Sequence, residues 1–188
     1  SDGYAGLRVI DVSDPTYPVE RTVLPTPDQI QGSAIADTLL FLAAWGEGIR
    51  IVSIANPDAP CEVGFYDTPD YAIHVFVSMP YAYVAERGAG MRILNVSDPA
   101  HPTEVGHFDT PGIACEVRVV DTIAYVADRE TGLRIISVAN PAAPWEISFF
   151  DTPDYAFGLD VIAVKRSGMV LAVLLMYAAL RWIEAHGG

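Results

Sequence analysis

Positive charge is scarce in this sequence of 188 residues, and lysine is almost missing. Lysine and arginine together number 11, against 24 aspartates and glutamates, so the formal net charge is −13, and Lys165 is the single lysine. A surface this negative repels phosphate backbones and anionic lipid headgroups. We therefore expect no nucleic-acid partner and no docking on an anionic membrane surface.

Cysteine and long hydrophobic runs are also in short supply. Two cysteines, Cys61 and Cys115, are too few for a disulfide scaffold. The most apolar stretch, Met169 to Leu180, is shorter than the roughly 20 residues that a membrane-spanning helix needs. The first residues carry neither the basic nor the apolar segment of a signal peptide. These absences argue against a disulfide-stapled domain and predict no insertion into a membrane.

Apolar residues, in contrast, are plentiful, and they occur in a repeat. Hydrophobic residues make up 51% of the chain and charged residues 19%, which excludes intrinsic disorder. Three short motifs recur every 42 residues without a gap. They are Gly-x-Arg, Asp/Asn-Pro and Thr-Pro, beginning respectively at Gly6, Gly48, Gly90 and Gly132; at Asp14, Asn56, Asp98 and Asn140; and at Thr26, Thr68, Thr110 and Thr152.

Each repeat has the pattern of four short strands. In one unit, turn residues separate four segments rich in β-branched and aromatic residues, at 72–78, 81–86, 91–97 and 103–109. Four antiparallel strands in about 42 residues are typical of a β-propeller blade, and segments that are apolar on both faces suit blades packed between neighbours. We therefore predict an all-β fold, a β-propeller of about four such blades.

The repeat resembles a known family. Gly132–Pro141, preceded by Ala124–Asp128, is similar to the LVIVD repeat, and the likeness extends from residue 4 to about residue 160. The resemblance implies a β-propeller of a bacterial or archaeal cell-surface protein, and hence an extracellular or cell-surface location. It implies little about activity.

The repeats predict one propeller domain over residues 1–188, with irregular ends. Its units are a partial blade at 1–24, repeats at about 25–66, 67–108 and 109–150, and a degenerate last unit at 151–188. Tyr177–Ala185 echoes Tyr4–Val12 at a longer offset than four periods, which indicates an insertion. For residues 168–185 we favour a degenerate strand over a terminal helix. The terminal strands would either close a four-bladed ring or belong to an arc of a larger propeller with covalently continuous further blades. The start in mid-blade favours the arc.

Two features of each repeat should meet on one rim of a propeller. The loop before each inner strand and the hairpin between the second and third strands lie on the same face. Their acidic and aromatic residues predict a face that binds a protein or a glycan, and a bound cation is an open alternative. For the repeated residues we favour a simpler role in turn structure. The predicted face comprises Trp45, Asp70, Tyr71, Glu86, Arg87, Asp128, Arg129, Asp154 and Tyr155.

Acidic residues precede the repeated arginines at a constant distance. Asp2, Glu86 and Asp128 each lie six residues before an arginine of the Gly-x-Arg motif, and Ala44 breaks this pattern. Across a tight hairpin, this spacing predicts structural ion pairs, each worth about 0–1 kcal/mol if exposed.

Positions that vary between repeats are better candidates for chemistry. On the inner strands, His74, Glu116, Arg118 and Asp160 should point toward the central channel or its mouth. A histidine, two carboxylates and an arginine are sufficient for general acid–base catalysis or anion binding. We favour the alternative that these charges satisfy one another.

Known metal, cofactor and nucleophile motifs are not found. The histidines have no zinc-ligand spacing, and neither a P-loop, a nucleophile elbow nor a calcium loop occurs. The two cysteines fall on strands more than one blade apart, so we expect two free thiols. We therefore expect a non-catalytic cell-surface scaffold without metal or cofactor, and as the alternative a hydrolase or lyase at the channel mouth.

Overall fold

The computed structural model describes residues 6–164 and 169–176, and within these ranges all regular structure is β-strand. Three four-stranded antiparallel sheets follow one another along the chain. We call them blades 1, 2 and 3. Blade 1 consists of β3 (Gly32–Ala36), β4 (Leu39–Ala43), β5 (Ile49–Ser53) and β6 (Cys61–Tyr66). Blade 2 consists of β7 (Ala72–Ser78), β8 (Tyr81–Glu86), β9 (Gly90–Asn95) and β10 (Thr103–Phe108). Blade 3 consists of β11 (Ala114–Val120), β12 (Ile123–Asp128), β13 (Leu133–Ser137) and β14 (Trp145–Phe150).

A two-stranded sheet lies at each end of this series. The N-terminal one, the outer half-blade, pairs β1 (Leu7–Asp11) with β2 (Val19–Leu24). Its place in the repeat is that of the last two strands of a blade. The C-terminal one, the inner half-blade, pairs β15 (Ala156–Val164) with β16 (Met169–Met176) and corresponds to the first two strands. The prediction of an all-β fold made of propeller blades is therefore confirmed.

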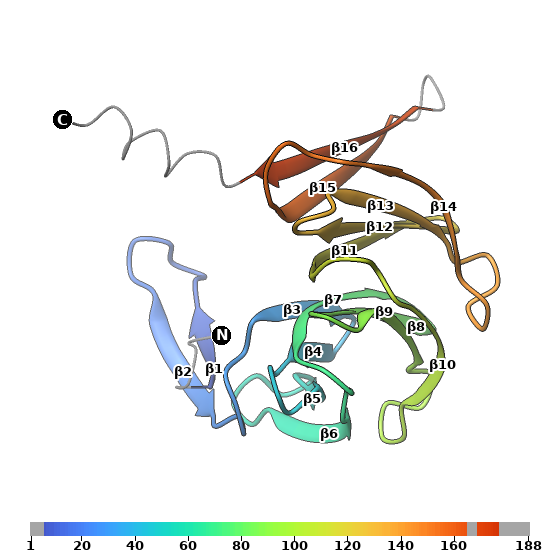
Figure 1. Ribbon diagram of the computed structural model, residues 1–188. Helices are drawn as coiled ribbons and strands as arrows, with labels where there is room; N and C mark the ends of the chain where they lie inside the picture. The colour runs from blue at the N-terminus through green and yellow to red at the C-terminus, as the bar shows by residue number, and fades with distance from the viewer. Residues whose placement is uncertain (1–5, 165–168, 177–188) are drawn as a thin grey trace.

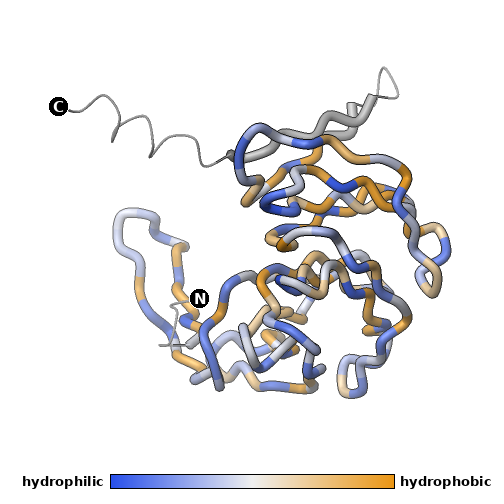
Figure 2. Tube along the Cα trace, in the orientation of Figure 1, coloured by the Kyte–Doolittle hydropathy of each residue, from blue (hydrophilic) through white to orange (hydrophobic). Residues whose placement is uncertain are grey.

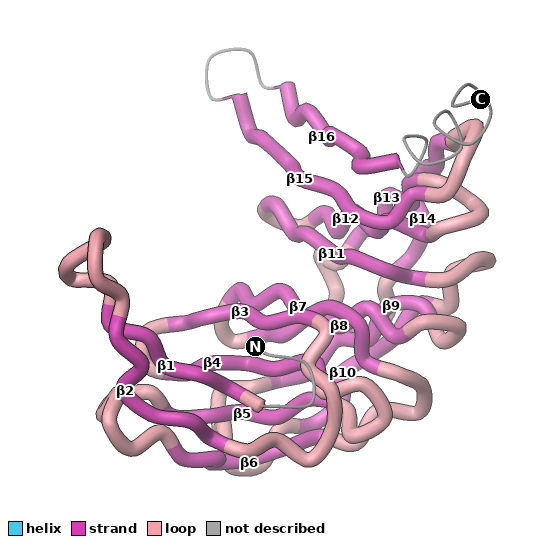
Figure 3. Tube along the Cα trace, turned by 90° about the vertical axis from the view of Figure 1, so that its left-hand side faces the viewer, coloured by secondary structure: helices cyan, strands magenta, loops and turns pink. Residues whose placement is uncertain are grey.

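The blades form an open arc. Their inner strands β3, β7, β11 and β15 contact one another in succession, and the two half-blades stand apart at its ends (Figure 1). The turned view in Figure 3 also keeps them apart. In the described residues each half-blade has two strands, so the structure matches the predicted arc and does not form the four-bladed ring.

Apolar residues between neighbouring sheets hold the arc together. Phe41 and Ile51 of blade 1 share one buried cluster with Val75 and Leu94 of blade 2. Similar clusters join blade 2 to blade 3, the outer half-blade to blade 1, and blade 3 to β15. Each four-stranded sheet is therefore apolar on both faces, and hydrophilic residues gather at turns such as that between β1 and β2 (Figure 2).

The last unit is a strand where its placement is described. Residues Met169–Met176 form β16, which confirms the favoured interpretation over a helix for this segment. Residues 177–185, with the predicted echo of the first repeat, lie outside the described residues. Among the described residues, no helix is long and apolar enough to cross a membrane.

Candidate functional site

The hairpin after the second strand of each blade reaches over to the next blade. Trp45, Arg87 and Arg129 occupy the same position in three repeats, and all have a positive φ, of 46°, 28° and 29°. Their backbone carbonyls accept hydrogen bonds from the amides that open the next inner strand, at Ala72, Ala114 and Ala156, with N···O distances of 3.0, 2.8 and 2.9 Å. The backbone of this position therefore links blades, while its side chain is free to vary.

The side chains at this position gather with aromatic rings. Trp45 stacks on Tyr71 with ring centroids 4.6 Å apart. The guanidinium carbon of Arg87 lies 5.4 Å from the centroid of the Tyr71 ring, and that of Arg129 lies 5.1 Å from Tyr155 and 5.3 Å from Phe157. These contacts form two clusters at equivalent places in the repeat. We call them together the aromatic rim, comprising Trp45, Tyr71, Arg87, Arg129, Tyr155 and Phe157.

A pocket opens beside the rim. It has a volume of about 280 Å³ and is lined by Gly46 and by the loop residues Thr68, Pro69, Asp70 and Tyr71. The predicted meeting of loop and hairpin on one face therefore occurs between blades 1 and 2. Whether the face binds a ligand stays a prediction.

The repeated aspartates of this face serve turn structure. The Asp70 carboxylate accepts hydrogen bonds from the amides of Tyr71 at 2.7 Å and Gly88 at 2.9 Å. Asp154 likewise accepts from the amide of Tyr155 at 2.8 Å. Each carboxylate thus holds its own turn, and that of Asp70 also ties the loop to the next hairpin.

Glu86 and Asp128 are not available to a ligand, which corrects their predicted place on the binding face. Both are fully buried. Glu86 accepts a hydrogen bond from Arg92 Nε at 2.8 Å, and burial raises its pKa to about 7 despite this contact. Asp128 accepts hydrogen bonds from the Thr110 hydroxyl at 2.6 Å and from the Thr131 hydroxyl. Turn and strand packing therefore draws both acids inward.

The predicted ion pairs form where the structure describes both partners. Besides Glu86 and Arg92, Asp128 lies 3.7 Å from Arg134, and these pairs are buried and not exposed. Asp2 lies outside the described residues. In blade 1, where Ala44 breaks the pattern, Glu47 supplies the carboxylate to Arg50 at 2.7 Å. The spacing of three residues between Glu47 and Arg50 is the sequence signal for this pair.

Three of the four predicted channel residues come together. Arg118 donates to Glu116 at 2.6 Å and to His74 Nε2 at 3.1 Å, and His74 Nε2 lies 3.6 Å from Glu116. The second oxygen of Glu116 accepts a hydrogen bond from the amide of Leu159 at 3.0 Å. Asp160 is exposed and accepts a hydrogen bond from the amide of Val161, apart from this cluster.

The protonation of His74 follows from its surroundings. Burial, with the charge of Arg118, lowers the pKa of His74 to about 4. Since Nε2 accepts the proton of Arg118, the neutral ring carries its own proton on Nδ1, which is buried without a hydrogen-bond partner in the protein. His74 is therefore a neutral acceptor for Arg118 near pH 7.

Among the residues that the structure describes, no group of three or more histidine, cysteine, aspartate or glutamate side chains is arranged to hold a metal ion. Cys61 is exposed and Cys115 half-buried, and both are free thiols. Burial raises the pKa of Cys115 to about 11, which disfavours its reactive thiolate.

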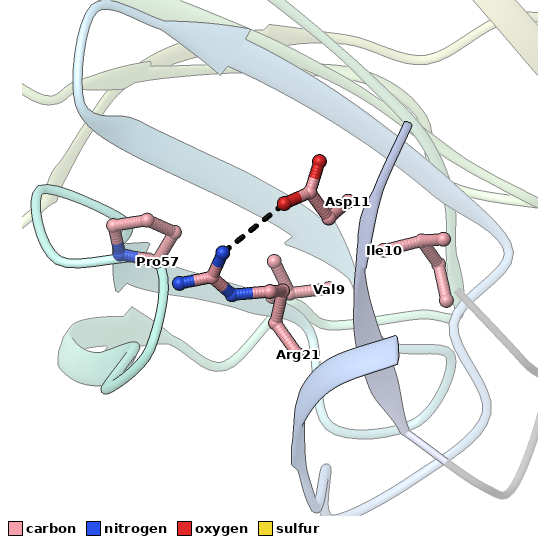
Figure 4. Close-up of a pocket in the computed structure, with 5 residues that line it drawn as sticks. All are labelled: Val9, Ile10, Asp11, Arg21 and Pro57. Carbon is pink, nitrogen blue, oxygen red and sulfur yellow. Dashed lines mark hydrogen bonds and ion pairs between the residues drawn. The ribbon is translucent and has the colours of Figure 1, made fainter. Parts of the chain in front are cut away.

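Sequence reasoning missed a second pocket, between the outer half-blade and blade 1. It has a volume of about 150 Å³ and is lined by Val9, Ile10, Asp11, Arg21 and Pro57 (Figure 4). Arg21 contacts Asp11 at 3.1 Å and also donates two hydrogen bonds, each of 2.8 Å, to Asp58 of blade 1. These ion pairs fasten the outer half-blade to its neighbour.

Solved structures with the same fold have unrelated sequences. The chain matches a protein of unknown function from Desulfotomaculum acetoxidans DSM 771 at a TM-score of 0.71 and 12% identity, covering 92% of this chain and 57% of that one. It matches the computationally designed Ika8 protein at a TM-score of 0.66 and 8% identity, covering 92% of this chain and 54% of that one. It also matches the computationally designed Ika4 protein at a TM-score of 0.60 and 7% identity, covering 82% of this chain and 96% of that one. The chain thus spans about half the length of the first two. No curated protein matches it.

The family is settled by the repeats themselves. The model of the LVIVD repeat matches residues 1–25, 34–68, 70–110 and 111–152, which is most of the chain. The resemblance found in the sequence is therefore confirmed, and the protein belongs to the LVIVD-repeat family.

Proposed function

We propose that this protein is a non-catalytic scaffold at the cell surface that binds a partner through the aromatic rim. The observation that carries this proposal is the clustering of Trp45, Tyr71 and Arg87, beside a pocket, on elements that the blades hold in place. Tryptophan, tyrosine and arginine are the residues most enriched at the energetic centres of protein interfaces. A protein partner is therefore favoured, and a glycan stacked on the exposed rings is the alternative.

The extracellular or cell-surface location belongs to the same proposal. It rests on the resemblance to LVIVD-repeat proteins. The acidic composition agrees with it, because a charged, soluble exterior suits a displayed module.

The test compares two pairs of exposed, arginine-stacked aromatic residues. We expect Tyr71→Ala with Tyr155→Ala to weaken binding at least tenfold, because the change removes the largest apolar contacts of the rim. The measurement is the affinity of the purified chain for ligands selected with the wild type from a displayed peptide library and a glycan array. The control is Phe65→Ala with Phe149→Ala, because these rings are also stacked with arginines but lie on outer strands, away from the rim. In each case the guanidinium carbon lies 4.8 Å from the ring centroid.

Two outcomes would contradict the proposal. Equal loss of binding in both double variants would show that the rim has no special role. The second outcome concerns the cluster of His74, Glu116 and Arg118. A neutral imidazole beside a carboxylate is an arrangement that a hydrolase or lyase could use, so such an enzyme is the alternative function. If His74→Ala abolished turnover of a substrate without changing the melting temperature, the scaffold proposal would fail. We favour the scaffold because Arg118 and the Leu159 amide already occupy both oxygens of Glu116.

A further inference from the structure

The last strand of blade 3 leaves one face uncovered. On β14, Ile147, Ser148 and Phe150 are exposed, with 62% of Phe150 accessible. The equivalent residues of the two preceding outer strands are buried or half-buried. These are Val63, Gly64 and Tyr66 on β6, and Val105, Gly106 and Phe108 on β10. Within the described part of the chain, this face of blade 3 therefore lacks the neighbour that blades 1 and 2 possess.

The covered strands show what that neighbour is. A Cβ added to Gly64 would lie 2.0 Å from the carbonyl oxygen of Pro99, and one added to Gly106 would lie 2.3 Å from that of Pro141. Each outer strand thus packs against the Asp/Asn-Pro turn that joins the last two strands of the following blade. The matching occupant for β14 is a two-stranded hairpin that carries such a turn.

The outer half-blade is a hairpin of this kind, and no sheet of the described residues packs on its side away from blade 1. Its turn begins at Asp14 and contains the hydrogen bond from the Tyr17 amide to the Asp14 carbonyl at 3.0 Å, as the turns at Asp98 and Asn140 do. Ile10 on β1 is 44% exposed, whereas the equivalent Leu94 and Ile136 are fully buried against the preceding blade. In Figure 4, Ile10 lies on the opposite side of β1 from Pro57 of blade 1.

The two uncovered faces are the two sides of one blade interface. We propose that the outer half-blade of a second copy of this chain docks on the Ile147–Phe150 face and lies beside the inner half-blade, completing a four-stranded blade between the copies. Among the described residues, the inner half-blade supplies the first two strands of such a blade and the outer half-blade supplies the last two. The faces of one chain stand apart in Figures 1 and 3, so the partner is a second copy. The chain covers about half of the Ika8 protein and of the Desulfotomaculum acetoxidans protein, which agrees with two copies forming one complete assembly of blades.

Such docking is head to tail, and in the proposed dimer two copies close a symmetric ring with two identical junctions. Each copy carries a net charge of −13, and this repulsion opposes the apolar contact. Salt screens the repulsion, and we therefore expect the fraction of dimer to rise with ionic strength.

The test is the mass of the purified 188-residue chain in solution. We expect twice the 20.3 kDa of one chain in sedimentation velocity or light scattering at micromolar concentration. Phe150→Asp or Ile10→Asp should each raise the dissociation constant at least tenfold. The matched control is Phe149→Asp, because Phe149 is the exposed neighbour on the opposite face of β14. Far-ultraviolet circular dichroism checks that each variant folds.

A mixing experiment separates this junction from any other dimer contact. Each Asp variant keeps one good face, so equal amounts of the two should form a mixed dimer through one intact junction, while each alone is monomeric. In a Cys61→Ser background, chains with Ser148→Cys and Thr16→Cys should form a mixed crosslink. A chain that stays monomeric at all salt concentrations, or a dimer that both Asp variants leave unchanged, would overturn the proposal.

Discussion

At the scale of single residues, the buried Glu86 and the half-buried His74 titrate in opposite senses. Burial raises the pKa of Glu86 from 4.5 to about 7, so the folded state binds more protons than the unfolded state between these values. Stability from Glu86 is therefore lost as the pH rises through this range. Burial lowers the pKa of His74 from 6.5 to about 4, so stability from His74 is lost as the pH falls through that range.

These opposing effects predict that variants of Glu86 and of His74 will change how the free energy of unfolding depends on pH, in opposite directions. When the pH is raised from about 5 to about 7, the free energy of unfolding of Glu86→Gln should increase relative to that of the wild type. Over the same change, the free energy of unfolding of His74→Gln should decrease relative to that of the wild type. The measurement is urea unfolding at both pH values, with Asp160→Asn as a control for an exposed inner-strand acid. Parallel profiles for all four proteins would mean that neither buried group titrates as the geometry indicates.

At the scale of elements, the outer strands differ at one position according to what lies against them. Gly106 of β10 faces the turn of the next blade, whereas Ser148 occupies the same place on the uncovered β14. An added methyl group at Gly106 must displace backbone, which costs about 1–3 kcal/mol in a packed site. This contact explains the glycine at this position of β6 and β10.

We therefore expect Gly106→Ala to lower the free energy of unfolding by about 2 kcal/mol, whereas Ser148→Ala stays within about 0.5 kcal/mol of the wild type. The measurement is thermal or urea unfolding of the dissociated chain, for example in the Phe150→Asp background. A larger loss for Ser148→Ala than for Gly106→Ala would contradict the assigned packing of the outer strands.

The strands themselves could be predicted because their signals are local. Turn residues delimit β7 to β10 in the sequence, and the predicted third strand at 91–97 and fourth strand at 103–109 differ little from Gly90–Asn95 and Thr103–Phe108. The burial of Glu86 could not be predicted in this way, because it depends on how Arg92 packs. The hydrogen bond from the Ala72 amide to the Trp45 carbonyl was also missed, since it depends on the register between blades.

At the scale of the whole molecule, the sequence left an open arc and a closed ring as alternatives. Ring closure depends on the small rotation between neighbouring blades, which no single motif encodes. The positions of the channel residues show the same limit. His74 and Glu116 were expected near one axis because the repeat aligns the inner strands, but the separate position of Asp160 on β15 follows from the local geometry of that strand.

The hairpin bridges between blades also make the molecule a linear chain of coupled units. Each blade is fastened mainly to its immediate neighbours, through one backbone bridge and one shared apolar cluster, so the ends have half the support of the middle. Fraying from the ends should therefore precede global unfolding, and amide hydrogen exchange of the dissociated chain should be slowest in β8 and β9 and fastest in β1, β2 and β16. Uniform protection across all strands would instead indicate a single cooperative unit.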